Sequence, residues 1–236
     1  MAIDLMRLAR LFEDIGIQLD EEQGQRFLGY ARLLLEWNEK INLTAITDGE
    51  GIEQKHFLDS VLPFTKIQLP QGCSVIDIGT GAGFPSCPLK IVRGDIKLTL
   101  LDSLNKRINF LKTLSDEIGL EAQCIHGRAE ELAKGDMREG YDCAVARAVA
   151  RLNTLCEYCL SYVKVGGMFA ALKGSSGGEE LEEAKNAVKT LGGEVEDFEE
   201  YCLPCGDKRT LIVIRKTKPT DARYPRNKGQ MVKKPL

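Results

Sequence analysis

The sequence predicts a doubly wound α/β fold preceded by a group of helices. After about residue 66, short apolar runs alternate with segments of helical periodicity, which is the pattern of a parallel sheet with right-handed crossovers. Before that point, apolar residues recur only at helical spacing. We therefore divide the chain into an N-terminal helical region at 1–66, an α/β core at 67–217 and a basic C-terminal tail at 218–236.

Helices are expected throughout residues 1–66. Apolar residues recur at helical spacing between residues 5 and 15 and again between 27 and 35. Asp20, followed by two glutamates, is a typical helix start. The stretch 42–49 breaks the periodicity, and a further helix is expected at about 52–64, where it ends near a proline.

Seven strands are expected in the core. Five strands that alternate with helices are expected at 73–78, 97–101, 122–125, 141–146 and 168–172. Pro85 suits the first turn of the helix that follows the first of these strands. Two further strands, near 194–203 and 210–215, flank a short polar loop, which indicates an antiparallel hairpin. The result is a seven-stranded sheet with one antiparallel strand.

Composition and the N-terminus indicate the compartment. The chain has 236 residues, of which 43% are hydrophobic and 28% charged, as in an ordinary globular protein. No apolar run approaches the roughly 18 residues that a membrane span needs. The first residues lack the charged and apolar regions of a signal peptide. We expect a cytoplasmic protein without membrane contact.

The eight cysteines include two pairs with C-x-x-C spacing, Cys156 with Cys159 and Cys202 with Cys205. A zinc site made from these four is conceivable. However, the first pair lies in an amphipathic helical pattern without the turn residues of a metal knuckle. We expect free thiols in a reducing compartment and no bound metal.

Charge is distributed unevenly along the chain. The net charge is only −3, yet the segment from Gly206 to Leu236 contains ten basic residues, opposed by Asp207 and Asp221. This asymmetry is typical of a basic tail that meets a polyanion. A solvated, disordered terminus would have the same composition, and charge alone does not separate the two interpretations.

A glycine-rich turn follows the first expected strand. Gly79, Gly81 and Gly83 allow backbone amides to close on a ligand near a helix N-terminus. A dinucleotide site would need its third glycine at Phe84, where a side chain crowds a pyrophosphate. With its acid, Asp77, the pattern resembles the first motif of class I methyltransferases. Their cofactor, S-adenosyl-L-methionine, carries an ammonium instead of phosphates, and Asp77 is its candidate partner, through water.

Two later strand ends provide candidates for binding a nucleoside. Asp102 ends the second strand, where an acid can accept both ribose hydroxyls of either NAD or S-adenosylmethionine. Ala129 and Glu130 follow the third strand, where a backbone amide and the Glu130 carboxylate are placed to read an adenine edge. In the alternative interpretation, Glu130 only occupies the first turn of a short helix.

Several segments together resemble one family. They are 42–46, 56–60, 77–85 and 101–107, followed by 128–130, 146–150 and 171–174. In this order they are similar to the RsmG (GidB) family, bacterial enzymes that methylate N7 of a guanine in small-subunit (16S) ribosomal RNA. The glycine motif alone is generic, whereas the His-Phe-x-Asp-Ser and Ser-Leu-x-Lys-Arg segments are specific. The resemblance spans about residues 33–215 and implies a class I, Rossmann-like methyltransferase.

The resemblance also implies which residues contact S-adenosylmethionine. They are Gly79, Phe84, Ala129, Glu130 and Arg147. Arg147 follows the fourth strand, from where it can reach the cofactor carboxylate or the RNA. In the alternative interpretation, it only forms an ion pair with Asp142 or Glu157.

No general base is expected. Guanine N7 has a lone pair and no proton, so methyl transfer requires alignment and exclusion of water. We therefore assign no catalytic residue and name His56, Asp59 and Arg147 as candidates. His56 and Asp59 lie one helical turn apart and face the same way. In one interpretation, these two residues contact the base or a phosphate of the RNA. In the other, His56 is a packing residue and Asp59 stabilises the helix.

Basic residues are expected to bind small-subunit ribosomal RNA or a ribosomal particle. The candidates for phosphate contacts are Lys106, Arg107, Arg128, Arg151 and Lys173. The tail from Lys216 to Lys234, with Tyr224, is expected to add electrostatic attraction.

Three other functions share parts of this pattern. A methyltransferase acting on a protein or a small molecule would share the cofactor half. A nucleotide-binding oxidoreductase is opposed by Phe84 and by the lack of an obvious hydride-transfer site. An RNA-binding module without catalytic activity would not depend on Asp77 or Gly79.

Overall fold

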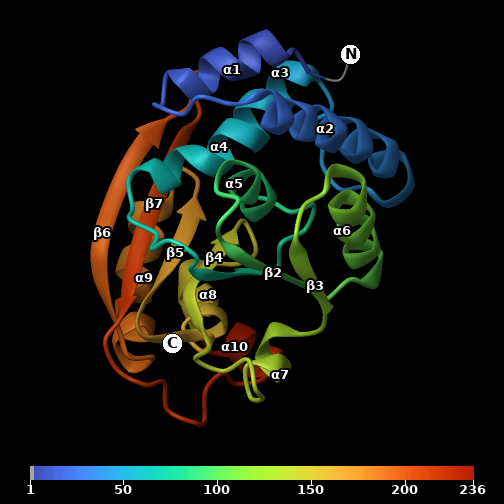
Figure 1. The fold of residues 1–236 in the computed structure, drawn as a ribbon. Helices are drawn as coiled ribbons and strands as arrows, with labels where there is room; N and C mark the ends of the chain where they lie inside the picture. The colour runs from blue at the N-terminus through green and yellow to red at the C-terminus, as the bar shows by residue number, and fades with distance from the viewer. Residues whose placement is uncertain (1–2) are drawn as a thin grey trace.

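A seven-stranded sheet in the order β3-β2-β1-β4-β5-β7-β6 runs through the computed structural model, which describes residues 3–236 (Figure 1). The strands are β1 Ser74–Ile78, β2 Lys97–Asp102, β3 Ala122–His126, β4 Tyr141–Arg147, β5 Val163–Lys173, β6 Gly193–Cys202 and β7 Lys208–Lys216. Strands β1 to β5 pair in parallel, and β7 is antiparallel to both β5 and β6. The predicted α/β class and terminal hairpin are confirmed.

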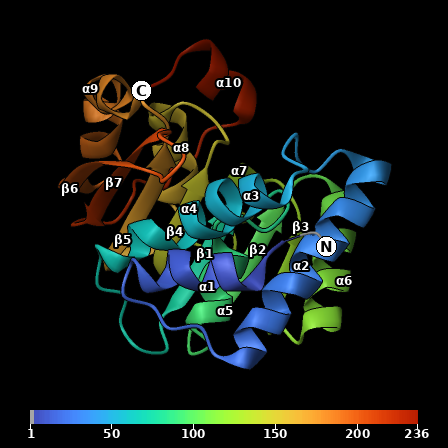
Figure 2. The same ribbon diagram turned by 90° about the horizontal axis from the view of Figure 1, so that it is seen from above.

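Helices cover both faces of the sheet. Those of the core are α5 Ser86–Val92, α6 Asn105–Ile118, α7 Ala129–Leu132, α8 Leu152–Cys159, α9 Gly177–Thr190 and α10 Lys228–Lys233. Figure 2 shows α5 and α6 on the same side as the N-terminal helices, with α8, α9 and α10 on the other. Alternating strand residues therefore enter two different hydrophobic clusters: Val75 packs into the first, Ile76 and Ile78 into the second.

The N-terminal region is helical, as predicted. It contains α1 Leu5–Glu13, α2 Glu21–Ile41, α3 Gly49–Gly51, a π-helix at Ile52–Leu58, α4 Asp59–Val61 and a 3-10 helix at Leu62–Thr65. Residues 1 and 2 of the predicted region lie outside the described residues. Asp20 caps α2 through a reciprocal capping box with Gln23. The last four helices follow one another directly from 49 to 65, so His56 and Asp59 lie on one helical segment.

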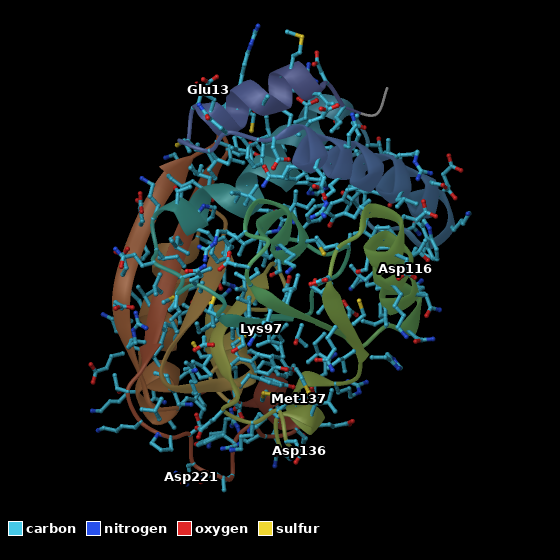
Figure 3. All side chains as sticks on the ribbon, in the orientation of Figure 1. Glu13, Lys97, Asp116, Asp136, Met137 and Asp221 are labelled. Atoms are coloured by element: carbon cyan, nitrogen blue, oxygen red, sulfur yellow. The ribbon has the colours of Figure 1, made fainter. Side chains whose placement is uncertain are left out.

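The C-terminal tail packs on the core instead of forming a solvated terminus. Tyr224 and Met231 are buried in the second hydrophobic cluster. Arg138 donates hydrogen bonds to the carbonyls of Thr220 (2.7 Å) and Tyr224 (2.8 Å). In Figure 3, Asp221 of this segment lies at the end of the molecule opposite Glu13 of α1. Within residues 3–236, no helix is long and apolar enough to cross a membrane.

Candidate functional site

A cavity of about 310 Å³ opens beyond the carboxyl ends of β1, β2 and β3, and we call it the β2–β3 cavity. Its lining consists of Ile78, Gly79, Leu101, Asp102, Ser103, Gly127, Arg128, Ala129, Glu130, Val149, Ala150, Thr154, Tyr158, Lys228 and Val232. Ligands of open α/β sheets bind at this edge. The sequence analysis predicted four of these residues as cofactor contacts: Gly79, Asp102, Ala129 and Glu130.

The glycine turn closes one side of the β2–β3 cavity. Gly79, Gly81 and Gly83 all have positive φ angles, of 71°, 62° and 95°. A Cβ atom on Gly79 would lie 2.8 Å from the side chain of Val149, which also lines the cavity. A Cβ atom on Gly83 would lie 2.7 Å from the Tyr30 hydroxyl. The turn therefore needs glycine for its backbone and for its space.

Asp102 fixes this turn from the second strand. Its Oδ2 accepts a hydrogen bond from the Gly81 amide (3.0 Å), and its Oδ1 accepts one from the Leu104 amide (2.9 Å). Arg107, a predicted phosphate ligand, instead points its Nη1 at Asp102 Oδ2 (3.2 Å). Asp102 also lines the β2–β3 cavity, and its contact with a ribose stays a prediction.

Asp77 lies beneath the glycine turn and is fully buried. It is not part of the lining of the β2–β3 cavity. Its Oδ2 accepts a hydrogen bond from Thr80 (3.0 Å), while its Oδ1 has no partner among residues 3–236. Burial raises the pKa of this carboxyl to about 7. Its predicted contact with an ammonium through water stays a prediction.

The far wall of the β2–β3 cavity combines predicted and unexpected residues. Ala129 and Glu130 begin α7, and the Glu130 carboxylate lies 3.6 Å from Arg128, a predicted phosphate ligand. Helix α8 contributes Thr154 and Tyr158 to the same lining. The C-terminal helix α10 contributes Lys228 and Val232. Neither segment was predicted as part of the site, because α8 was expected only as an ordinary amphipathic helix and the tail only as a charged segment.

A second cavity, of about 560 Å³, adjoins the first and shares Val149 and Ala150 with it; we call it the cationic cavity. It is lined by Ile46, Lys55, His56, Asp59, Arg147, Ala148, Val149, Ala150, Arg151, Leu172, Lys173, Gly174, Glu180 and Arg209. Five of these residues are lysine or arginine, so the cavity suits an anionic ligand. It contains all three candidates for catalysis, His56, Asp59 and Arg147.

Asp59 holds two arginines at the cationic cavity. Its Oδ2 lies 3.3 Å from Nη1 of Arg147 and 3.0 Å from Nε of Arg209. Asp59 is 3% exposed, and Arg147 also donates to the Lys55 carbonyl (3.3 Å). Arg209 is the second residue of β7 and follows Asp59 by 150 residues. Arg209 was noted only as one of the ten basic residues of the C-terminal segment. No sequence pattern around it predicts an ion pair with Asp59.

The alternative ion pairs considered for Arg147 are wrong. Asp142 instead pairs with Lys164 and accepts hydrogen bonds from Ser74. Glu157 pairs with Arg226 (2.7 Å). Arg147 is therefore available to the site at the end of β4, with Asp59 as its acidic partner.

An aromatic stack supports the cationic cavity. The His56 ring lies parallel to the ring of Phe84, with centroids 4.4 Å apart, and Tyr30 stacks on Phe84 at 5.2 Å. The Arg147 guanidinium lies 5.0 Å from the centre of the Phe84 ring. Phe84 is buried and lines neither of the two cavities, so it supports the site through His56 and Arg147.

His56 is neutral in this position. Its Nε2 lies 2.8 Å from the Thr44 hydroxyl, and its Nδ1 has no hydrogen-bond partner within the described part of the chain. Burial, followed by the positive charge of Arg147, lowers the pKa of His56 to about 3. A histidine with this pKa does not bind a phosphate as a cation.

The remaining predicted phosphate ligands differ in availability. Lys173 is buried, pairs with Glu180 (2.7 Å) and donates to the Ala150 carbonyl (2.6 Å), so its ammonium shapes the cavity wall instead of facing a ligand. Arg151 pairs with Glu183 (2.5 Å) at the surface, and Lys106 is exposed near the start of α6.

Some lysines and arginines of the tail form ion pairs within the protein. Lys216 is fully buried, pairs with Glu139 (3.1 Å) and donates to the Leu160 carbonyl (2.5 Å). The expectation that the whole segment from Lys216 attracts RNA is therefore wrong for this residue, and Arg226 is committed to Glu157.

The two C-x-x-C pairs lie in different environments. Cys156 and Cys159 are buried in α8, whereas Cys202 and Cys205 are exposed at the turn between β6 and β7. Across residues 3–236, no group of three or more His, Cys, Asp or Glu side chains is arranged to hold a metal ion.

Comparison with known sequences identifies the family. A sequence model described as rRNA small subunit methyltransferase G (GidB) matches residues 23–212. The chain belongs to this family. A methyltransferase G from Alkaliphilus metalliredigens is 51% identical, covering 95% of each chain. The protein of the same name from Clostridium beijerinckii is 48% identical over 99% of this chain and 98% of its own.

Solved structures support the fold of this methyltransferase G family member. TrmN from Thermus thermophilus superposes with a TM-score of 0.54 at 16% identity, over 67% of this chain and 48% of its own. A SAM-dependent methyltransferase from Aquifex aeolicus gives 0.52 at 16% identity, over 70% of this chain and 93% of its own. The class I methyltransferase fold and the predicted family are both confirmed.

Proposed function

We propose that this chain transfers the methyl group of S-adenosylmethionine to N7 of a guanine in small-subunit (16S) ribosomal RNA, in the cytoplasm. One observation carries the proposal. In a member of the methyltransferase G family, a cavity suited to a nucleoside adjoins a cationic cavity, and Val149 and Ala150 line both. A cofactor in the first cavity would thus lie beside a base in the second.

The β2–β3 cavity fits S-adenosylmethionine. Its volume lies near the lower end of the range for small-molecule sites, about 300 to 1,000 Å³. Asp102 supplies a ribose acceptor, and Ile78, Leu101 and Val149 supply apolar walls. Beneath the glycine turn, the unpartnered Oδ1 of the buried Asp77 can accept a hydrogen bond from an ammonium or a bridging water.

Methyl transfer to N7 depends on the alignment of the reactants and needs no proton transfer. When bound, S-adenosylmethionine supplies an electrophilic methyl group on a sulfonium. Guanine N7 needs no deprotonation, and the neutral His56, held by Thr44, is not called on as a base. We assign His56, Phe84 and Asp59 to the support of the cavity, where they fix Arg147 and Arg209. Side chains held in this way reduce the entropy cost of aligning the reactants.

The cationic cavity is assigned to the RNA. Enzymes that modify a base inside a nucleic acid usually extrude it into a pocket. Arg147 and Arg209 offer guanidinium groups for a phosphate or for the O6 of the base, and Lys55 adds charge at the rim. The ion pair of Lys55 with Asp207 (3.1 Å) is partly exposed and can exchange for a phosphate.

The test is methylation with labelled cofactor. Purified chain is incubated with 16S ribosomal RNA, with intact small subunits, and with free protein and metabolites as controls. We expect label on one guanine of the RNA, and chemical cleavage at 7-methylguanine should map it. Label found on protein or on small molecules, with none on RNA, would contradict the proposal. The same assay distinguishes naked RNA from the assembled particle as substrate.

A further inference from the structure

We infer that the C-terminal helix α10 is a wall of the cofactor site, in which Val232 and Lys228 contact the bound nucleoside. The inference rests on the proposed function, because it takes the β2–β3 cavity to hold S-adenosylmethionine. Both residues line that cavity. They lie outside the segment matched by the family model, which ends at residue 212, although the two relatives described above match over 95% and 99% of the chain.

The register of α10 directs these two residues to the cavity. Lys228 and Val232 are four residues apart, so they lie on the same face of the helix. Met231 points instead into the second hydrophobic cluster and is fully buried. One face of α10 thus anchors it to the protein, while an adjoining face is left to the cavity.

A buried ion pair docks the start of α10 on helix α8. The Arg226 Nε donates to Glu157 Oε1 (2.9 Å), its Nη2 donates to Oε2 (2.7 Å), and its backbone amide donates to Oε1 (2.7 Å). Glu157 is fully buried. On the same helix, Thr154 and Tyr158 line the β2–β3 cavity. The pair therefore joins α10 to the helix that forms the neighbouring wall.

The end of α10 is tied to its beginning. Nη1 of Arg226 donates to the carbonyl of Lys234 (2.9 Å), across the length of the helix. The Asn227 side chain caps the first turn by accepting from the Gln230 amide (2.9 Å). A helix of six residues is not stable alone in water, so these contacts hold its cavity face in place.

The exposure of Val232 at the cavity indicates that a ligand covers it. It is 65% exposed, although it is a large apolar residue on a helix otherwise rich in lysine, and it lines the cavity. A nucleoside in the cavity would cover this side chain and bury apolar area from both partners. Its helical neighbour Lys228 would extend its methylene chain along the same surface.

Calorimetric titration of the full-length protein with S-adenosylhomocysteine tests the inference. We expect Val232→Ala to weaken binding by about five-fold, and Lys228→Gln by about two- to three-fold. Lys233→Gln is the matched control, since Lys233 is an exposed residue of α10 that does not line the cavity. It should bind as the wild type does. Thermal unfolding midpoints should be equal for all four proteins.

A second measurement follows the helix itself. Amides of 228–233 should exchange with solvent more slowly once S-adenosylhomocysteine is bound, and Val232→Ala should reduce this protection. If the wild type binds but Val232→Ala and Lys228→Gln bind equally well, α10 is not a wall of the site, and the proposed function stands. If the wild type itself has no measurable affinity, both the inference and the proposed function are overturned.

Discussion

The two adjoining cavities are built in different ways. The β2–β3 cavity is formed mainly by strand ends and by the turns that follow them, so most of its lining comes from a few short segments. The cationic cavity is formed by charged side chains that hold one another: Asp59 from the N-terminal helices, Arg147 from β4 and Arg209 from β7. The first depends on backbone conformation, and the second depends on ion pairs between distant elements.

Because of this difference, the two cavities are sensitive to different substitutions. A turn with positive φ angles is specified locally by glycine, and a side chain there disturbs the cavity directly. An ion-pair cluster is specified only when three regions have folded together, and loss of its central acid leaves buried charge without a partner.

The largest effect is expected for Asp59→Ala, which leaves Arg147, whose side chain is 16% exposed, without its acidic partner. We expect a loss of about 3 kcal/mol in the free energy of unfolding, measured by chemical denaturation. Asp207→Ala removes a partly exposed acid that also pairs with Arg209 (3.4 Å), and it should leave the unfolding midpoint unchanged. Equal stability of the two variants would show that Asp59 does not hold the cluster.

Gly79→Ala should disrupt the β2–β3 cavity. The added methyl group lies 2.8 Å from Val149 at a φ of 71°, so either the turn or the cavity wall must move. We expect affinity for S-adenosylhomocysteine to fall by about 100-fold in calorimetric titration. Gly166→Ala is the matched control, because Gly166 also has a positive φ (88°), but no atom of the described residues lies within 4 Å of an added Cβ. Similar losses in both variants would rule out a specific role for the space at Gly79.

Arg209→Ala should affect the RNA half alone. We expect kcat/KM for 16S ribosomal RNA to fall by about 30-fold, since one guanidinium contact is lost. Affinity for S-adenosylhomocysteine should not change, because Arg209 does not line the β2–β3 cavity. Arg10→Ala, at an exposed arginine of α1, serves as the control. A parallel loss of cofactor affinity in Arg209→Ala would contradict the separation of the two cavities.

The smallest of the effects on binding or activity is a pH dependence of cofactor affinity. Burial raises the pKa of Asp77 to about 7, so this carboxyl is largely protonated at pH 6 and ionised at pH 8. If it receives the cofactor ammonium through water, affinity for S-adenosylhomocysteine should rise about five-fold between these pH values. Asp77→Asn should abolish the rise. His56, with a pKa of about 3, stays neutral across this range and does not contribute.

The same raised pKa has a consequence for stability without cofactor. Asp77 binds its proton more tightly when folded than when unfolded, where its pKa is about 3.9. The stabilisation that its proton provides to the folded state is therefore fully present below the unfolded-state pKa. This stabilisation is lost as the pH rises towards 7. Asp77→Asn should show a smaller fall in unfolding free energy across this range, and an identical slope in both proteins would argue against the raised pKa.

The sequence alone determined the order of elements and the glycine turn. Strand and helix periodicities are local, and so is the need for glycine where φ is positive, as at Gly79 and Gly81. Asp102, Ala129 and Glu130 were also predictable, because parallel strands end at one edge of the sheet and the residues that follow them meet there.

Only the tertiary structure decided which charges are free. Lys173 and Lys216 read as surface cations, yet both are buried against acids and carbonyl groups. Arg209 and Val232 gained their places at the cavities through contacts that depend on the folding of the terminal hairpin and α10. The pairing of Asp59 with Arg209 joins residues 150 positions apart. Because local periodicity fixes the element in which a residue lies but not its distant neighbours, these contacts cannot be read from the sequence.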